Sequence, residues 1–274
     1  MNNRLKKVAI TVLIVIGVLM VAAVVLGVLN ALLGGGNWTF GWQDYRYDET
    51  GYTVGQGTVP VNRVTAIDLD WIDGEVEVLL CHDTFISLTE TSAEELSESA
   101  RLRWMVDTDG TLHIKYRKSS WFFGIGSSGR DKKLTLRIPE AFLSDLQSLD
   151  IQVESSEVSV RQISAASFSF ESASGDLTVA DCDFGSAEVD SISGDLDLRF
   201  PVCPAEASVS TVSGDVILYL PDSASFALAW DTVSGKFSHD FALSEAESVY
   251  THGSGGSAIR IETVSGDLVL GALQ

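Results

Sequence analysis

The sequence predicts an all-β domain, a solenoid-like stack of two-strand repeats of about 20 residues, preceded by one transmembrane helix. Three observations predict this class: apolar residues that alternate with polar ones, a short motif that recurs at near-constant spacing, and an apolar run near the N-terminus. We expect residues 1–7 to be a cytoplasmic N-terminus, 8–33 the transmembrane helix, 34–60 a juxtamembrane linker and 61–274 an extracytoplasmic β-repeat domain. A two-sheet β-sandwich is the alternative fold.

The apolar run from Val8 to Leu33 contains no charged residue. As a helix it would measure about 39 Å at about 1.5 Å per residue, more than the roughly 30 Å of a hydrocarbon core. Arg4, Lys6 and Lys7 precede it, so the positive-inside rule places the N-terminus in the cytoplasm. A cleaved signal peptide is the alternative, although its apolar core is usually about 7–15 residues long. The expected location is the cell membrane, with a single span and the C-terminal domain outside the cytoplasm.

The composition is strongly acidic, with 38 Asp and Glu against 18 Lys and Arg and a net charge of −20. Such a charge argues against nucleic acid as a partner, because the phosphate backbone would be repelled. The expected partners are the membrane, through the N-terminal helix, and envelope proteins or cell-wall polymers.

Period-two alternation marks the first strands of the domain. It is clearest in Ile67–Trp71, Glu75–Val78, Leu112–Tyr116 and Leu134–Ile138. Apolar residues at every second position are typical of strands with one buried face. Asp109-Gly110, between two such runs, predicts a hairpin turn.

A repeated motif, Ser/Thr-x-Ser-Gly-Asp/Lys-apolar, organises the rest of the chain. Its five copies are Ser172–Leu177, Ser191–Leu196, Thr211–Val216, Thr232–Phe237 and Thr263–Leu268. The apolar positions change parity at each glycine, which a flat strand cannot do while keeping one face buried. Each repeat is therefore predicted to be two short strands joined at a glycine corner. The long interval between Ser234 and Ser265 is where a regular stack is expected to break.

One position of the motif predicts a column of acidic residues. Asp176, Asp195, Asp215 and Asp267 share it, and Lys236 takes it in the fourth copy. Carboxylates stacked about 4.8 Å apart repel one another unless they splay into water or share a hard cation. These four residues are therefore the calcium candidates, with solvated side chains as the alternative reading.

Aromatic residues and cysteines supply the other candidates. Trp121, Phe122 and Phe123 stand beside a glycine-rich stretch and predict either an exposed contact patch or a cap on the core. Gly124–Gly129 matches a dinucleotide fingerprint, but a strand pattern follows it where a helix is required, so it predicts a loop. Cys182 and Cys203 lie one repeat apart and could form a disulfide or remain buried thiols.

No pattern in the sequence indicates catalysis. The four histidines, His82, His113, His239 and His252, lack ligand spacing, and no C-x-x-C motif is present. We therefore expect no catalytic residues and no cofactor.

Ile67–Val76, Lys133–Pro139 and the Ser-Gly-Asp-Leu repeats together resemble a bacterial, membrane-anchored β-strand-repeat family of unknown function whose members are regarded as candidate adhesins. The resemblance runs from about Val61 to the C-terminus. It implies an envelope location and a repeat architecture, and it brings no catalytic residues to carry over.

The function expected is that of a non-enzymatic, membrane-anchored envelope protein that presents a β-repeat surface for adhesion or partner recognition, including envelope-stress sensing. The alternative is a carbohydrate-active β-helix enzyme acting on cell-surface polysaccharide. That enzyme would need a groove with clustered Asp, Lys or Arg, whereas the basic residues beyond Asp131 are few and dispersed. A purely structural spacer is a third possibility.

Overall fold

The structure is a computed structural model that describes residues 45–119, 132–246 and 248–273. The expected membrane span 8–33, the Trp121–Phe123 patch and the glycine-rich stretch 124–129 lie outside the described residues. Within those described, no helix is both long and apolar enough to cross a membrane.

The chain divides into two units. The smaller contains residues 1–48 and 119–127, of which only 45–48 and Ser119 are described. There, the Tyr47 N–H donates to Ser119 Oγ at 3.2 Å. The larger unit, residues 49–118 and 128–274, contains every strand described below.

Two ladders of strands make up the larger unit, and long strands that turn a corner belong to both. Ladder A contains, in spatial order, β1 (Thr53–Val54), β5 (Arg103–Val106), β6 (Thr111–Lys115), β3 (Ala66–Cys81), β8 (Ser148–Arg161), β9 (Ser164–Ser174), β11 (Asp183–Ser193), β13 (Glu206–Ser213), β19 (Ser257–Ser265), β15 (Phe226–Ser234), β18 (Val249–His252) and β17 (Ser244–Ala246).

Ladder B contains, in spatial order, β2 (Gly57–Pro60), β4 (Phe85–Thr91), β7 (Lys133–Pro139), β3, β8, β10 (Leu177–Ala180), β12 (Leu196–Arg199), β14 (Val216–Pro221), β20 (Leu268–Leu273) and β16 (Phe237–His239). Pairing is parallel along the middle of each ladder. It is antiparallel at both ends of ladder A and at the β2–β4 end of ladder B, whereas ladder B ends at β16 in parallel pairing. Two short 3-10 helices, η1 (Val61–Arg63) and η2 (Glu140–Asp145), lie in the connections. The parallel register is that of the predicted stack and not that of a sandwich.

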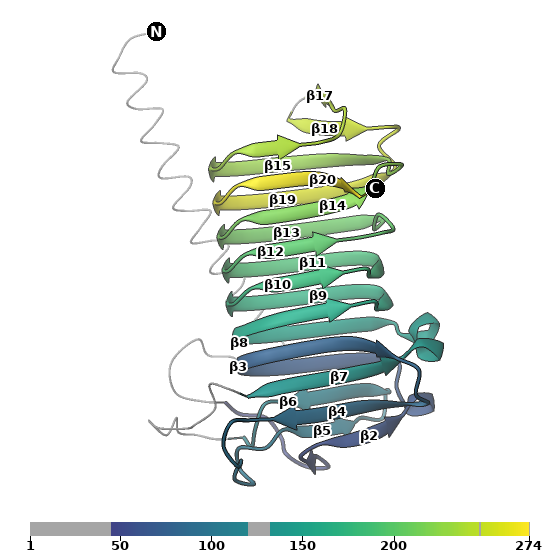
Figure 1. The fold of residues 1–274 in the computed structure, drawn as a ribbon, viewed down its shortest axis with the longest axis vertical. Coiled ribbons are helices and arrows are strands. Elements are labelled where there is room, and N and C mark those ends of the chain that lie inside the picture. Colours follow the sequence, from purple (N-terminus) through teal and green to yellow (C-terminus); the bar gives the residue numbers. More distant parts are fainter. Residues whose placement is uncertain (1–44, 120–131, 247, 274) are drawn as a thin grey trace, which may run out of the picture. The chain divides into compact units, whose positions relative to one another are not determined.

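The order of layers in space differs from their order in the chain. The last repeat, β19 and β20, lies between β13–β14 and the fourth repeat, β15–β16, as the yellow strands of Figure 1 show. At the other end, β3 lies between β6–β7 and β8. The stack therefore does become irregular at the long interval, as expected. After that interval, β19 and β20 are inserted between the two layers that precede them in the chain.

The motif glycines form one column, as predicted, because consecutive layers touch there. A β-carbon on Gly194 would lie 2.2 Å from the Gly175 carbonyl oxygen, and one on Gly214 would lie 2.0 Å from that of Gly194. A β-carbon on Gly235, on the last layer, would lie 2.0 Å from the Gly266 carbonyl oxygen. Positive φ was the predicted reason for glycine, and it holds at Gly194 (128°) and Gly214 (149°), whereas close approach is common to the whole column.

The core fills the space between the two ladders with stacked apolar side chains. Phe168 and Phe184 on consecutive layers are parallel with ring centroids 4.7 Å apart, and Phe200 meets Phe184 edge-on at 6.3 Å. Each is at most 1 % exposed. Full burial of such a side chain contributes roughly 1.5–3 kcal/mol, so stacking alone stabilises the repeats.

Aromatic side chains close the core at the last layer. Phe226 on β15 contacts Phe241 at 5.2 Å and His252 on β18 at 5.7 Å, measured between ring centroids. Phe237 on β16 meets Tyr250 on β18 at 4.9 Å. The β17–β18 hairpin thus caps a repeat that has no further layer to cover it.

Candidate functional site

The four calcium candidates lie in one column, and each carboxylate serves the backbone of a neighbouring layer. Asp176 Oδ1 accepts a hydrogen bond from the Asp195 N–H at 2.8 Å, and Asp195 Oδ1 accepts one from the Asp215 N–H at 3.0 Å. Asp215 and Asp267 continue the series, each at 2.8 Å, the latter accepting from the Lys236 N–H. We call this series the Asp ladder.

The Asp ladder gives the motif aspartate a structural role. Each carboxylate satisfies a backbone donor at a corner where the strand ladder is interrupted. Lys236 stands on the last layer, where no further N–H needs an acceptor, so it ends the column and does not interrupt it as the chain order suggests. In the described part of the chain, no three His, Cys, Asp or Glu side chains are grouped to hold a metal ion. Calcium binding at the four aspartates stays a prediction.

The three cysteines are free thiols, so the Cys182–Cys203 disulfide is not formed. Cys182 is fully buried, and burial raises the pKa of its thiol to about 11. A thiol with such a pKa is a poor nucleophile, which fits a packing role.

A chain of ionic contacts crosses the outer face of β3 and β6. His113 Nδ1 lies 2.6 Å from Asp68 Oδ2, and its Nε2 lies 2.9 Å from Asp107 Oδ2. Lys115 Nζ donates to Asp68 at 3.3 Å and also pairs with Asp70. The turn after β5 fixes Asp107, whose Oδ1 accepts the N–H of Thr111 on β6 at 2.8 Å. We call these five charged residues the β3–β6 network.

Within this network, burial and ion pairing shift the pKa of each group in opposite directions. Burial raises the pKa of Asp70 to about 6 despite the pull of Lys115. Hydrogen bonds that the imidazole donates to Asp68 and Asp107 raise the pKa of His113, although partial burial lowers it. For Asp68, burial is outweighed by His113 and Lys115 together, so the pKa of this carboxyl is lowered. The imidazole is therefore held in its charged form between two carboxylates.

Further carboxylates continue along the outer face of ladder A. Register places Glu171 on β9 beside Asp190 on β11, and Asp150 on β8 beside Asp68 on β3. Burial raises the pKa of Asp150, Glu154, Glu171 and Asp190. Register places Asp150 and Glu188 in one column and Glu171 and Asp190 in the next. We call the surface formed by Asp150, Glu154, Glu171, Glu188 and Asp190 the acidic face.

An aliphatic column runs beside the acidic face, at the motif position between the two hydroxyl residues. It consists of Ala173, Ile192, Val212, Val264 and Val233. The first four are half-buried, and Val233, on the last layer, is 65 % exposed. Regular spacing of the layers thus places carboxylates and aliphatic side chains in adjacent rows.

A buried ion pair lies near the antiparallel end of the stack. Lys132 Nζ lies 2.6 Å from Glu90 Oε1, with side-chain exposures of 1 % and 5 %. The ammonium also lies over the rings of Trp71 and Tyr116, 4.6 and 4.0 Å from their centroids. Burial lowers the pKa of Lys132 to about 8 although Glu90 opposes this. The backbone of Gly74 packs closely against the Lys132 carbonyl group.

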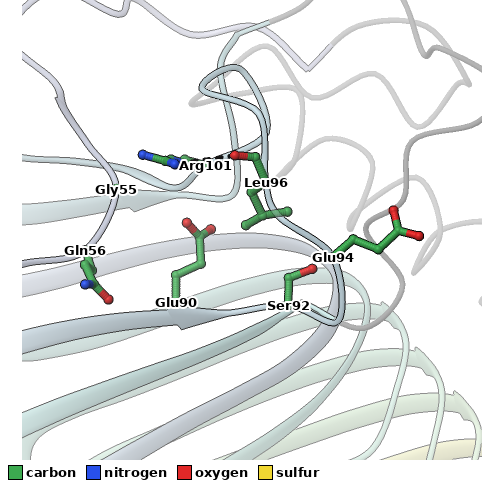
Figure 2. A pocket seen from close by; sticks show the side chains of 7 residues that line it. All are labelled: Gly55, Gln56, Glu90, Ser92, Glu94, Leu96 and Arg101. Carbon is green, nitrogen blue, oxygen red and sulfur yellow. Dashed lines mark hydrogen bonds between the residues drawn. The ribbon is translucent and has the colours of Figure 1, made fainter.

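Glu90 borders a hollow of about 310 Å³ on the surface (Figure 2). Its walls come from the turn between β1 and β2, the end of β4 and the segment that follows β4. The lining residues are Gly55, Gln56, Glu90, Ser92, Glu94, Leu96 and Arg101. Figure 2 shows the Glu90 carboxylate standing in the hollow, with Arg101 and Leu96 across from it and Glu94 turned away.

Sequence reasoning did not single out this hollow. Glu90 lies near the end of a strand with ordinary alternation, and nothing in its neighbours in the sequence distinguishes it from the other acidic residues. Lys132 carries a weak signal, since it lies two residues before the Leu134–Ile138 strand, and register aligns it with the glycine column. Only the pairing of β4 with β7 brings the two residues together.

Comparison with known proteins agrees with the repeat architecture. A solved structure described as a candidate cell adhesion protein from Clostridium sporogenes aligns with a TM-score of 0.52 and 13 % identity, covering 81 % of this chain and 100 % of its own. A second, described as a candidate adhesin from Bacteroides fragilis, aligns with a TM-score of 0.39 and 13 % identity, covering 81 % and 97 %. No curated protein matches the chain in sequence.

The family model for Toastrack DUF4097 matches residues 64–199 and 202–270, which include every motif copy, the strands from β3 to β19 and the first half of β20. This agrees with the resemblance read from the sequence. The chain therefore belongs to the Toastrack DUF4097 family.

Proposed function

We propose that this chain is a non-enzymatic, membrane-anchored envelope protein whose β-stack presents a rigid surface for adhesion or partner recognition. The observation that carries the proposal is the pairing of the acidic face with the aliphatic column on the outer face of ladder A. Strand pairing about 4.8 Å apart fixes both rows, so the surface needs no ordering when a partner binds.

The chemistry of this surface selects a basic partner. Register holds Glu171 beside Asp190, and burial already disfavours their charged forms, so opposite charge from a partner would stabilise both. The aliphatic column adds apolar area at the same place. The fold shared with the Clostridium sporogenes chain, described as a candidate cell adhesion protein, points in the same direction. Envelope-stress sensing would be one form of such recognition.

The test is binding of the full-length chain, in detergent-containing buffer, to purified cell-wall polymers and to membrane-protein fractions from the envelope. The test variant is Glu171→Gln/Glu188→Gln/Asp190→Asn. The control, Asp183→Asn/Asp222→Asn/Asp240→Asn, removes the same charge from exposed positions off the acidic face. We expect binding to one fraction that the test variant weakens by about tenfold, because each lost charge pair contributes up to about 1 kcal/mol.

Equal binding by both variants would remove the acidic face as the contact surface. Release of new reducing ends from cell-wall polysaccharide would instead favour the carbohydrate-active alternative.

A further inference from the structure

We propose that the hollow at Glu90 is a binding site for a small carboxylate that also carries a hydrogen-bond donor, either an ammonium or a hydroxyl group. This site is separate in kind from the proposed contact surface, since it would take a small molecule and not a macromolecule. Its volume of about 310 Å³ is at the lower end of the range for ligand pockets.

Glu90 supplies a fixed acceptor. Its side chain is 5 % exposed, and Oε1 is held by Lys132 Nζ at 2.6 Å and by the Leu102 N–H at 2.9 Å. The other oxygen, Oε2, has no hydrogen-bond partner within the described ranges. This oxygen can be reached from the hollow, because Glu90 lines it (Figure 2). A carboxylate fixed on one oxygen and open on the other is prepared to accept a donor from a ligand.

Arg101 supplies a fixed donor. Its Nε donates to the Leu96 carbonyl at 3.3 Å, which anchors the guanidinium to the segment that closes the hollow. The two terminal nitrogens make neither a hydrogen bond nor an ion pair with any residue that the structure describes. A guanidinium with both terminal nitrogens unused is suited to bidentate contact with a carboxylate.

The balance of charge identifies the ligand. Lys132 neutralises Glu90, and Glu94, the other acidic lining residue, is turned away (Figure 2), so Arg101 is the unpaired charge beside Glu90 and favours an anionic group. Among the residues that the structure describes, Gln56 and Ser92 have no side-chain hydrogen-bond partner, and none of those lining the hollow has an aromatic ring to stack on a sugar. A carboxylate on Arg101 with an ammonium or hydroxyl on Glu90 satisfies both fixed groups. An α-amino acid and an α-hydroxy acid share this chemistry.

The test is isothermal titration calorimetry on the full-length chain in detergent-containing buffer. The probes are alanine, lactate, propionate and ethylamine. Alanine and lactate carry both groups, whereas propionate lacks the donor and ethylamine lacks the carboxylate. We expect one or both of alanine and lactate to bind, and propionate and ethylamine to bind at least about tenfold more weakly, since a charge-assisted hydrogen bond is lost.

Variants locate the site. Arg101→Met should weaken binding by at least about tenfold, and Gln56→Ala should weaken it by a smaller factor. Arg63→Met, an exposed arginine on η1, is the matched control and should bind as the unmodified chain does. Thermal melting of each variant shows that the fold is retained. The proposal is overturned if neither alanine nor lactate binds at millimolar concentration, or if Arg101→Met binds as tightly as Arg63→Met.

Discussion

The backbone N–H of Lys236 donates to Oδ1 of Asp267 at 2.8 Å, although the two residues are 31 positions apart in the chain. Asp267 belongs to the last repeat and Lys236 to the repeat before it. This single contact shows that the chain places its final layer inside the stack and leaves the preceding one at the end.

The Asp ladder should stabilise the stack. We expect Asp267→Ala to lower the free energy of unfolding by about 1–2 kcal/mol, because the Lys236 N–H loses a charged acceptor. Asp267→Asn keeps an acceptor oxygen and should cost less. The measurement is chemical denaturation, with Asp183→Ala as an exposed aspartate outside the ladder. A loss for Asp183→Ala as large as that for Asp267→Ala would contradict the role assigned to the ladder.

At the corner glycines, a steric clash with the next layer should lower stability more than backbone strain does. Gly194→Ala places a β-carbon 2.2 Å from a carbonyl oxygen at positive φ, and Gly235→Ala places one at 2.0 Å where no positive φ is recorded. Gly51 has a φ of 86° but its β-carbon would be 4.0 Å from the nearest atom. We expect Gly51→Ala to cost about 1–2 kcal/mol, as for a left-handed conformation, and the two corner variants to cost more.

Thermal denaturation of the three variants tests this order. If Gly235→Ala were as mild as Gly51→Ala, the layers would not be in contact at the corner.

The β3–β6 network should make stability depend on pH near neutrality. The folded pKa of His113 is raised above its usual 6.5 by Asp68 and Asp107, so its contribution is fully present below pH 6.5 and is lost as pH rises through the folded pKa. We expect the unfolding free energy to fall as pH rises above 6.5, and His113→Gln to flatten that fall. The comparison is urea denaturation across this range, with His82→Gln as the exposed control.

Asp70 acts at lower pH. Its folded pKa of about 6 lies above its usual 3.8, so folding favours the protonated form and stability declines as pH rises between the two values.

A pH profile of His113→Gln identical to that of the unmodified chain above pH 6.5 would show that the imidazole is not held charged.

The buried pair of Lys132 and Glu90 should behave as a unit. Lys132→Met leaves Glu90 charged and 95 % buried, so we expect a loss of about 3–5 kcal/mol. Adding Glu90→Gln removes the stranded charge and keeps an acceptor for the Leu102 N–H, so the double variant should recover part of the loss. A double-mutant cycle by chemical denaturation measures the coupling. If the losses of stability in the two single variants were strictly additive, that result would contradict the coupling of Lys132 and Glu90.

The local features of the fold could be predicted from the sequence, and the order of its layers could not. Period-two alternation and the parity change at glycine are local, so they identified the strands around Ile67 and Leu134 and the corners. The order depends on which strands pair at long range, as β19 does with both β13 and β15. Each repeat offers nearly the same edge to its neighbours, and only side chains such as Lys236 distinguish the last layer.

The candidate site was harder to predict for a related reason. Glu90 and Lys132 meet because β4 pairs with β7 in antiparallel register, and neither strand carries a motif that announces the contact. The acidic column was found from its repeat spacing, but its hydrogen bonds to the backbone depend on the position of each carboxylate relative to the next layer.

The backward placement of β19 and β20 has a consequence for how the chain matures. Residues 226–239 can dock only on the layer formed by 257–273, because their parallel partners in the two ladders lie there. During synthesis from the N-terminus, this segment therefore lacks its parallel partners until residues 257–273 have been made. Loss of residues 257–273 would leave the β15–β16 layer without its parallel partners, and the apolar side chains of that layer, Phe226 among them, would lose their cover.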